Sequence, residues 1–344
     1  MSEADNLLEE TVDRLLADRC TPDAMERAEA EGWCAPVWDG LMAAGFSHIA
    51  LPEEAGGAGG SLTDAAAVLR VLGRYAAPVP FAETTLLGGW LLTRAGLPLP
   101  EGPITVVPEL LSLRSERITG RSRVAWAGSA RAIVAAPDGL LVAVVDPSDV
   151  GIEPGSNLAG EPRESVRFDV PLREVARRPA PAGVDPAALR RRGALSRVLL
   201  MAGAAETMSR MTVEYAYDRH QFGQPIARFQ AVQQHLVVVA QCAAQLSMAA
   251  DLAVRAVERG PALMEIAAAK VIADDAAVSG TRAAHQAHGA MGMTREYPLH
   301  RLTRALWSWR HEYGHAGSWS RQLGDLAHEV GADGLFPLVT SSEP

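Results

Sequence analysis

The stretch YAYDRHQFGQPIARFQ, from Tyr215 to Gln230, decides how the chain is organised. It joins two long segments, about 187–218 and 226–258, in which apolar residues recur at the i, i+3, i+4 spacing of one helix face. Gly223 and Pro225 interrupt this pattern and predict a turn. Arg219 and Gln221 therefore lie at a helix end, where a guanidinium can bind phosphate oxygens bidentately. A solvated arginine in an interhelical turn is the alternative that the pattern alone leaves open.

A second stretch, QAHGAMGMTREYP, runs from Gln286 to Pro298 and follows a third helical segment at about 261–288. Gly289 and Gly292 end that segment. Small residues there let a ligand approach the backbone, whose amides can bind a pyrophosphate. An ordinary glycine C-cap is the alternative. The three segments, with a final helix after Pro298, predict a helical bundle.

The remainder of the chain divides by composition. Residues 1–100 have helical spacing, with a glycine loop at Gly56–Gly60 and a helix capped by Ser61 or Thr63. Residues 101–182 hold short apolar runs separated by Pro, Gly, Asp or Ser, which predict a shortened β domain. Residues 183–344 form the bundle. We therefore expect a mostly α fold with a small β domain, in the order α, β, α.

The bulk properties exclude several classes of protein. A formal charge of −9 and a pI of about 5.5 argue against a nucleic-acid-binding surface. Cys20, Cys34 and Cys242 are widely spaced without a CxxC pair, which indicates reduced thiols, a cytoplasmic location and no metal site. The N-terminus lacks the apolar core of a signal peptide, and we predict no membrane span.

Three segments together resemble the acyl-CoA dehydrogenase family. RHQFGQPIARFQ resembles the family signature R-x-Q-F-G-x-P-I-x-x-F-Q, and HQAHGAMGMTREYPLHR resembles its Q-x-x-G-G-x-G segment with the following YP-x-x-R. LPEEAGGAGGSLTDAAAVLRVLGR resembles the family's N-terminal loop and helix. The likeness is strong over 195–305 and weak over 101–182.

The resemblance implies an N-terminal helical domain, a middle β-barrel-like domain and a C-terminal four-helix bundle. It also implies FAD as cofactor, an acyl-CoA substrate, a flavoprotein as electron acceptor, and a homo- or hetero-oligomer with another such chain. In the family, the two C-terminal motifs hold the ADP part of FAD across a subunit interface. The matching positions here are Arg219, Gln221, Phe222, Gln230, Gln286, His288, Gly289 and Ala290.

The chain departs from the family where the chemistry takes place. The family reaction removes an α-proton with a carboxylate while the β-hydride moves to the flavin, and the position of that base falls on Tyr313. Glu312 is one residue early, about 100° away on a helix, and is our candidate for the base; a salt-bridged glutamate is the alternative. The flavin-contacting hydroxyl falls on Gly128, and a substrate-contacting arginine falls on Ala194, with Arg197 near but out of register.

These departures suggest a hypothesis about assembly. The ADP-binding motifs are kept while the flavin-ring and base positions are altered, as expected for one subunit of a heteromeric dehydrogenase of lipid or steroid catabolism, such as the two-gene actinobacterial enzymes of steroid side-chain degradation.

Our first prediction is FAD-dependent α,β-dehydrogenation of an acyl-CoA thioester. A flavin-dependent monooxygenase on the same fold, or a catalytically silent subunit that grips FAD for its partner, are the alternatives.

Overall fold

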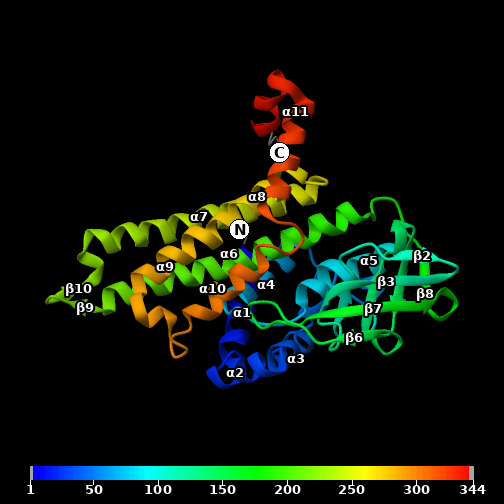
Figure 1. Cartoon of the computed structure of the whole chain (residues 1–344), viewed down its shortest axis with the longest axis horizontal. Coiled ribbons are helices and arrows are strands. Elements are labelled where there is room, and N and C mark those ends of the chain that lie inside the picture. The colour runs from blue at the N-terminus through cyan, green and yellow to red at the C-terminus, as the bar shows by residue number, and fades with distance from the viewer. Residues whose placement is uncertain (1–2, 341–344) are drawn as a thin grey trace.

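The N-terminal part is a cluster of helices that packs beside the bundle (Figure 1). The computed structural model describes residues 3–340. The elements of this part are α1 (Glu3–Arg19), α2 (Pro22–Glu31), α3 (Ala35–Ala43), the short turns η1 (Phe46–His48) and η2 (Glu53–Ala55), α4 (Leu62–Arg74), the π-helical η3 (Ala82–Gly88) and α5 (Gly89–Ala95). Of the two expected caps of α4, Ser61 is the one used. Its hydroxyl accepts from the Asp64 amide at 3.1 Å, and the Asp64 carboxylate accepts from the Ser61 amide at 2.7 Å.

The middle part holds two four-stranded sheets. Their orders are β1-β4-β5-β8 and β2-β3-β7-β6, and β1 and β4 are the parallel pair. Its elements are β1 (Ile104–Val106), β2 (Ser112–Arg114), β3 (Arg117–Ala125), β4 (Ala132–Ala135), η4 (Pro137–Gly139), β5 (Leu141–Val145), η5 (Pro147–Asp149), β6 (Gly151–Glu153), β7 (Arg163–Pro171), η6 (Leu172–Glu174) and β8 (Ala176–Pro179). A separate apolar core, including Ile118, Ile133 and Phe168, joins the sheets. The expected small β domain is present.

The C-terminal part is the helical bundle. Its elements are α6 (Pro186–Asp218), β9 (His220–Gln221), β10 (Gln224–Pro225), η7 (Ile226–Arg228), α7 (Gln230–Arg259), α8 (Leu263–Asp275), the π-helical η8 (Ala276–Gly280), α9 (Thr281–His288), η9 (Gly289–Met293), α10 (Leu299–Trp309) and α11 (Ala316–Thr340). The segment expected as one helix over 261–288 is a continuous rod of α8, η8 and α9. The α–β–α fold predicted from the sequence is confirmed.

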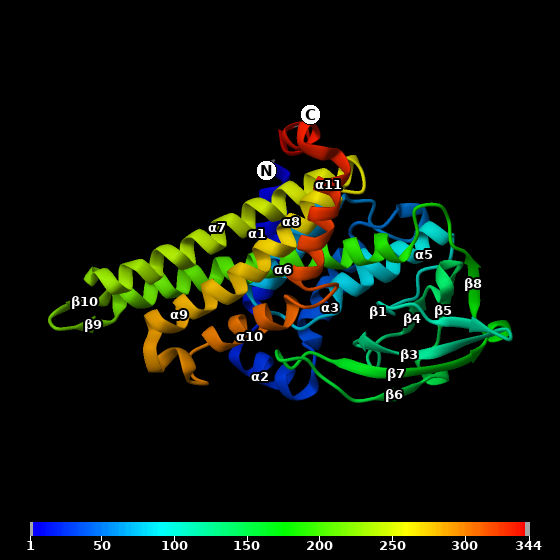
Figure 2. The same cartoon turned by 45° about the horizontal axis from the view of Figure 1, so that its top comes forward.

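The helix α6 determines where the site residues lie. It packs against α4, α7, α8 and α10, and the β9–β10 hairpin at its C-terminal end lies at the opposite end of the molecule from the β domain (Figures 1 and 2). Its 33 residues give a rod of about 50 Å. The two ends of α6 are therefore separate chemical environments.

By length and composition, the helix α7 is long and apolar enough to cross a bilayer, although the sequence analysis predicted no membrane span. Among the described residues it alone meets that criterion, and 44% of its most apolar window is buried in the bundle. Since α7 packs along α6, α8 and α9, a core helix of a bundle satisfies the same criterion.

Candidate functional site

The first motif forms an exposed hairpin at the end of α6. Phe222 and Gly223 both have positive φ, 52° and 79°, as the two central residues of a tight hairpin turn require. The Ile226 amide donates to the Arg219 carbonyl at 2.8 Å and closes the hairpin. Phenylalanine is strained in this conformation and its side chain is 92% exposed. A strained and exposed aromatic side chain indicates a contact surface.

The second motif lies against the first. The Tyr215 hydroxyl donates to the His288 carbonyl at 3.2 Å, and the two rings stack with centroids 4.5 Å apart. Tyr297 completes the cluster, with its ring centroid 5.0 Å from that of His288. The His288 side chain is buried and burial lowers its pKa, so this predicted cofactor residue joins the two motifs and is not one of the exposed donors.

The other predicted cofactor residues face solvent. The side chains of Arg219, Gln221 and Gln286 are exposed and make no hydrogen bond or ion pair with any described residue. Gln230, Gly289 and Ala290 are exposed beside them, and a Cβ at Gly289 would meet no atom within 4 Å. One guanidinium, several amides and open backbone at one end of the bundle fit the diphosphate and ribose of a dinucleotide.

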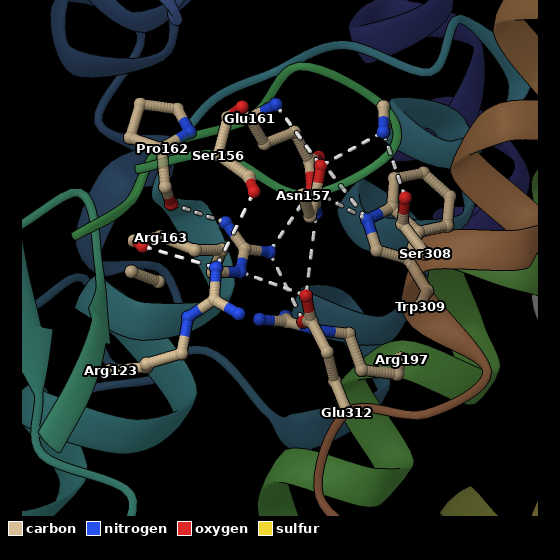
Figure 3. A network of polar contacts seen from close by, with 12 residues as sticks. Arg123, Ser156, Asn157, Glu161, Pro162, Arg163, Arg197, Ser308, Trp309 and Glu312 are labelled. Carbon is tan, nitrogen blue, oxygen red and sulfur yellow. Dashed lines mark hydrogen bonds and ion pairs between the residues drawn. The ribbon is translucent and has the colours of Figure 1, made fainter. Parts of the chain in front are cut away.

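Glu312 lies far from that surface, in a buried network of charges (Figure 3). Its carboxylate accepts from Arg163 at 2.8 and 3.1 Å and from Arg197 Nε at 2.5 Å. Arg197 also pairs with Glu83, and Arg163 pairs with Glu161 at 3.0 Å. The charged residues come from all three parts of the chain: from η3, from β7, from α6 and from the turn after α10. The network therefore links these three parts.

Neutral and aromatic groups enclose these charges. Asn157 and the Trp309 indole donate to the Glu161 carboxylate at 2.7 and 3.0 Å, and the Trp126 ring lies 4.7 Å from the Arg163 guanidinium. Lys270, the only lysine in the sequence, donates to the Glu312 carbonyl at 3.0 Å and to the Arg310 carbonyl at 3.1 Å. Burial lowers the pKa of Lys270 to about 7, so at neutral pH the two arginines, Arg163 and Arg197, are the permanent cations among the three carboxylates.

Burial and the two neighbouring arginines determine the pKa of Glu312. Burial alone opposes ionisation, but Arg163 and Arg197 outweigh it and lower the pKa of Glu312 to about 2. The carboxylate is therefore ionised at neutral pH. Its lone pairs point at guanidinium hydrogens and not at a cavity.

Tyr313 is packed against the bundle next to this network. Its backbone is left-handed, with φ of 56°, and its ring lies 5.3 Å from the Arg197 guanidinium. A Cβ at Gly193 of α6 would come within 2.2 Å of the ring, so only glycine fits beneath it. Burial raises the pKa of Tyr313 above its ordinary value of 10. The phenol ring thus covers α6 at Gly193.

Comparisons with known proteins identify the family. The family model described as "Acyl-CoA dehydrogenase, N-terminal domain" matches residues 2–98, and "Acyl-CoA dehydrogenase, C-terminal domain" matches residues 191–314. The acyl-CoA dehydrogenase IpdE2 of Mycobacterium tuberculosis is 31% identical over 86% of this chain and 88% of its own length. This chain belongs to the acyl-CoA dehydrogenase family. The predicted oxidoreductase class and the predicted cofactor, FAD, are confirmed.

Other relatives include a longer protein and chains from solved complexes. FadE34 of Mycobacterium tuberculosis is 30% identical to this chain over 88% of the chain's residues. The matched region is only 43% of the length of FadE34. The solved ChsE4–ChsE5 complex of Mycobacterium tuberculosis contains a chain with a TM-score of 0.84 and 25% identity, covering 96% of this chain and 99% of that one. A steroid acyl-CoA dehydrogenase, Tcur3481–Tcur3483, matches with the same score and identity.

Sequence reasoning missed the network that surrounds Glu312. It noted Arg197 only as being out of register with the family, and it did not single out Glu83, Glu161 or Arg163. Two signals were available: Arg197 stands alone in the apolar run of α6, and Glu83 stands alone in PFAETTLL. A single charge inside an otherwise buried helical segment requires a partner of opposite charge.

Proposed function

We propose that this chain is the FAD-holding, non-catalytic subunit of a heteromeric acyl-CoA dehydrogenase. The observation that carries the proposal concerns the position of the catalytic base. In this chain Tyr313 occupies the position of the family base, and its ring packs on Gly193. Its partner supplies the base and the pocket for the flavin ring, while this chain supplies Arg219 and Gln286 to the diphosphate.

Glu312 is unsuited to be the base that our sequence analysis suggested. A carboxylate with a pKa of about 2 accepts a proton less readily than one with the ordinary value of 4.5. To reach a substrate, it would have to leave both Arg163 and Arg197, and breaking a buried charge pair costs about 3–5 kcal/mol. We assign it a structural role, as the anion that joins α6 to the β domain.

The distance along α6 supports a cofactor shared between chains. Ala194 and Arg219 are 25 residues apart on this helix, which at 1.5 Å per residue is about 37 Å. One extended dinucleotide is shorter than that. This separation supports our proposal that the flavin whose diphosphate these donors bind has its ring in another chain.

The relatives support the same assembly. Both solved structures are complexes of two different chains by their titles, ChsE4–ChsE5 and Tcur3481–Tcur3483, and the latter is named a steroid enzyme. FadE34 extends well beyond the region that this chain matches, leaving room for a second unit of the same size. We extend to this chain a partner of the same fold and an acyl-CoA substrate, with steroid-derived acyl groups as the first to test. A cytoplasmic location belongs to the same proposal, with Cys20, Cys34 and Cys242 as free thiols.

When bound, FAD would supply the hydride acceptor for dehydrogenation of the acyl group, with a flavoprotein as the electron acceptor. The residues of this chain would bind FAD and hold it in a fixed orientation. Arg219 would neutralise phosphate charge, the amides of Gln221 and Gln286 would donate to oxygen atoms, and Phe222 would cover the adenine end. Tyr215 and His288 would keep the two motifs at a fixed separation.

The proposal is tested by co-purifying the chain with the product of a neighbouring acyl-CoA dehydrogenase gene. We expect flavin absorbance and dye-coupled acyl-CoA oxidation in the complex. Arg219→Ala should lose at least tenfold in FAD affinity, whereas Arg173→Ala, an 83% exposed arginine in the β domain, should lose none. Glu312→Gln should keep the turnover of the complex within a few-fold.

Two results would contradict the proposal. One is full flavin loading and acyl-CoA turnover by the isolated chain. The other is a folded, FAD-loaded Glu312→Gln complex with turnover reduced by a thousandfold or more, as expected for loss of a catalytic base. Oxygen consumption with reduced flavin in the same assay would instead favour the monooxygenase alternative.

A further inference from the structure

A cleft of about 440 Å³ lies where α1, α4, α6 and α10 meet. We name it the α10 cleft and define it by six of its lining residues: Met25, Tyr75, Thr207, Met211, Arg301 and Leu302. Thr207 is ten residues from Arg197 and twelve from Arg219 along α6, about 15 and 18 Å at 1.5 Å per residue. The cleft is therefore separate from the buried charge network and from the exposed hairpin, and its volume is typical of sites for small organic molecules.

The guanidinium of Arg301 lies in the wall of this cleft without a hydrogen-bond partner. Its Nε is buried, and no residue in the described part of the chain accepts a hydrogen bond from it. The Oε1 of Glu29 is 3.7 Å from this nitrogen, which is too far for a hydrogen bond. Since buried donors are nearly always paired, Nε of Arg301 points to an acceptor that the chain itself does not provide.

The charges around Glu29 leave an excess of positive charge beside the cleft. Arg295, Arg301 and Arg304 approach this one carboxylate at 3.8, 3.7 and 3.7 Å. Three guanidiniums thus share a single carboxylate, although the formal charge of the whole chain is −9. Arg301 is the member of this group that lines the α10 cleft, so the excess charge attracts an anion into the cleft.

The other charged residues of the lining do not compete with Arg301 for that anion. Arg74 and Arg210 also line the cleft, and they donate to glutamates of α6 at 3.1 and 3.0 Å. Asp13 is the carboxylate of the lining, and it comes from α1, whereas Arg301 comes from α10. Among the described residues that line the cleft, Arg301 therefore has the guanidinium that is left to bind an anion, and it binds a single charge.

Methionine and aromatic side chains form the apolar part of the cleft. Met25 is buried, and Met211 and Tyr75 are half-buried. Thioether sulfur atoms and a tyrosine ring make favourable contacts with an aromatic ring. We propose that the α10 cleft binds a small aromatic carboxylate, with its ring between these three side chains and its carboxylate on Arg301. The inference is independent of the proposed function, since no residue of the cleft belongs to the cofactor surface.

The test is isothermal titration calorimetry of the full chain with 2-naphthoate, and with 2-naphthamide as its uncharged counterpart. We expect one 2-naphthoate per chain and at least tenfold weaker binding of the amide, because the amide lacks the charge that Arg301 binds. Arg301→Gln should weaken 2-naphthoate binding at least tenfold. Thr207→Phe, which fills the cleft from α6 without removing a charge, should do the same. The matched control is Arg295→Gln: this arginine is 85% exposed, approaches the same Glu29 and does not line the cleft, so its loss should change the affinity less than twofold.

Three results would overturn the site: no measurable binding at millimolar 2-naphthoate, equal affinity for the amide, or wild-type affinity in Thr207→Phe. Circular dichroism establishes that each variant is folded, and Thr207→Phe decides the outcome if Arg301→Gln does not fold. Arg219→Ala should bind 2-naphthoate as tightly as the wild type while it loses FAD. Loss of both ligands in that variant would contradict a separate site, whereas retained FAD would count against the cofactor proposal alone.

Discussion

Replacing Glu312 by glutamine tests whether the buried network is structural. At neutral pH the change removes one of the three carboxylates and leaves Arg163 and Arg197 each with one remaining anionic partner. Holding the pKa of Glu312 near 2 instead of 4.5 corresponds to roughly 3 kcal/mol in favour of the ionised form. We therefore expect Glu312→Gln to lower the free energy of unfolding by roughly 3 kcal/mol at pH 7.

The pH dependence provides a second, independent signature. A carboxyl group whose pKa is lowered in the folded state stabilises the fold above its unfolded pKa, and this stabilisation is lost as the pH falls toward the folded value. The difference between wild type and Glu312→Gln should therefore shrink from roughly 3 kcal/mol at pH 6 to roughly 2 kcal/mol at pH 3.5.

The assay is urea unfolding followed by tryptophan fluorescence, because Trp126 and Trp309 contact the network directly. Glu153→Gln is the control: its partner Arg121 is 60% exposed, and such a surface pair contributes less than about 1 kcal/mol. Equal losses in the two variants, or a Glu312→Gln difference that does not change with pH, would refute the structural assignment.

Two further predictions concern close packing around the same turn. Gly193→Ala should destabilise the chain by about 2 kcal/mol in thermal or urea unfolding, because its Cβ would lie 2.2 Å from the Tyr313 ring, and Tyr313→Ala in the same chain should recover most of that loss. Gly324→Ala, where a Cβ meets nothing within 4 Å, is the control, and additive losses at Gly193 and Tyr313 would count against the contact. Lys270 carries the only ε-amine of the chain and is 1% exposed, so mass spectrometry should find it unmodified by an amine reagent until urea unfolds the chain; rapid labelling of the native chain would show that the turn opens.

The sequence predicted the fold well because each element obeys its own periodicity. The helix expected at 187–218 is Pro186–Asp218, which Asp185 caps by accepting from the Ala188 amide. Periodicity could not reveal the π-helical turn η8, because AAVSG keeps the small, apolar character of the helix around it. The strand β3 carries Arg121 and Arg123 on its exposed face, so an apolar run in the sequence could not mark its full length.

The site was predictable only where a motif stands in continuous sequence. Arg219, Gln221 and Phe222 lie on one hairpin, so a short pattern is enough to find them. The residues around Glu312 come from positions 83, 161, 163 and 197, and only the folded chain brings them together. No spacing rule relates a residue of η3 to one of β7, and so the sequence left Glu312 as a candidate base with a salt bridge as the alternative.

The left-handed turn at Tyr313 also bears on how easily this chain could become a catalyst in its own right. A glutamate at that position would match the base that the family resemblance implies but would not have its reactivity, because the new carboxylate would lie near the Arg197 guanidinium, which is now 5.3 Å from the phenol ring. That cation would hold it ionised, and removing the cation would leave Glu83 without its ion-pair partner and Glu312 with Arg163 alone. If the chain is the non-catalytic subunit that we propose, an independent active site would thus require several simultaneous changes and could not be reached by one mutation at a time.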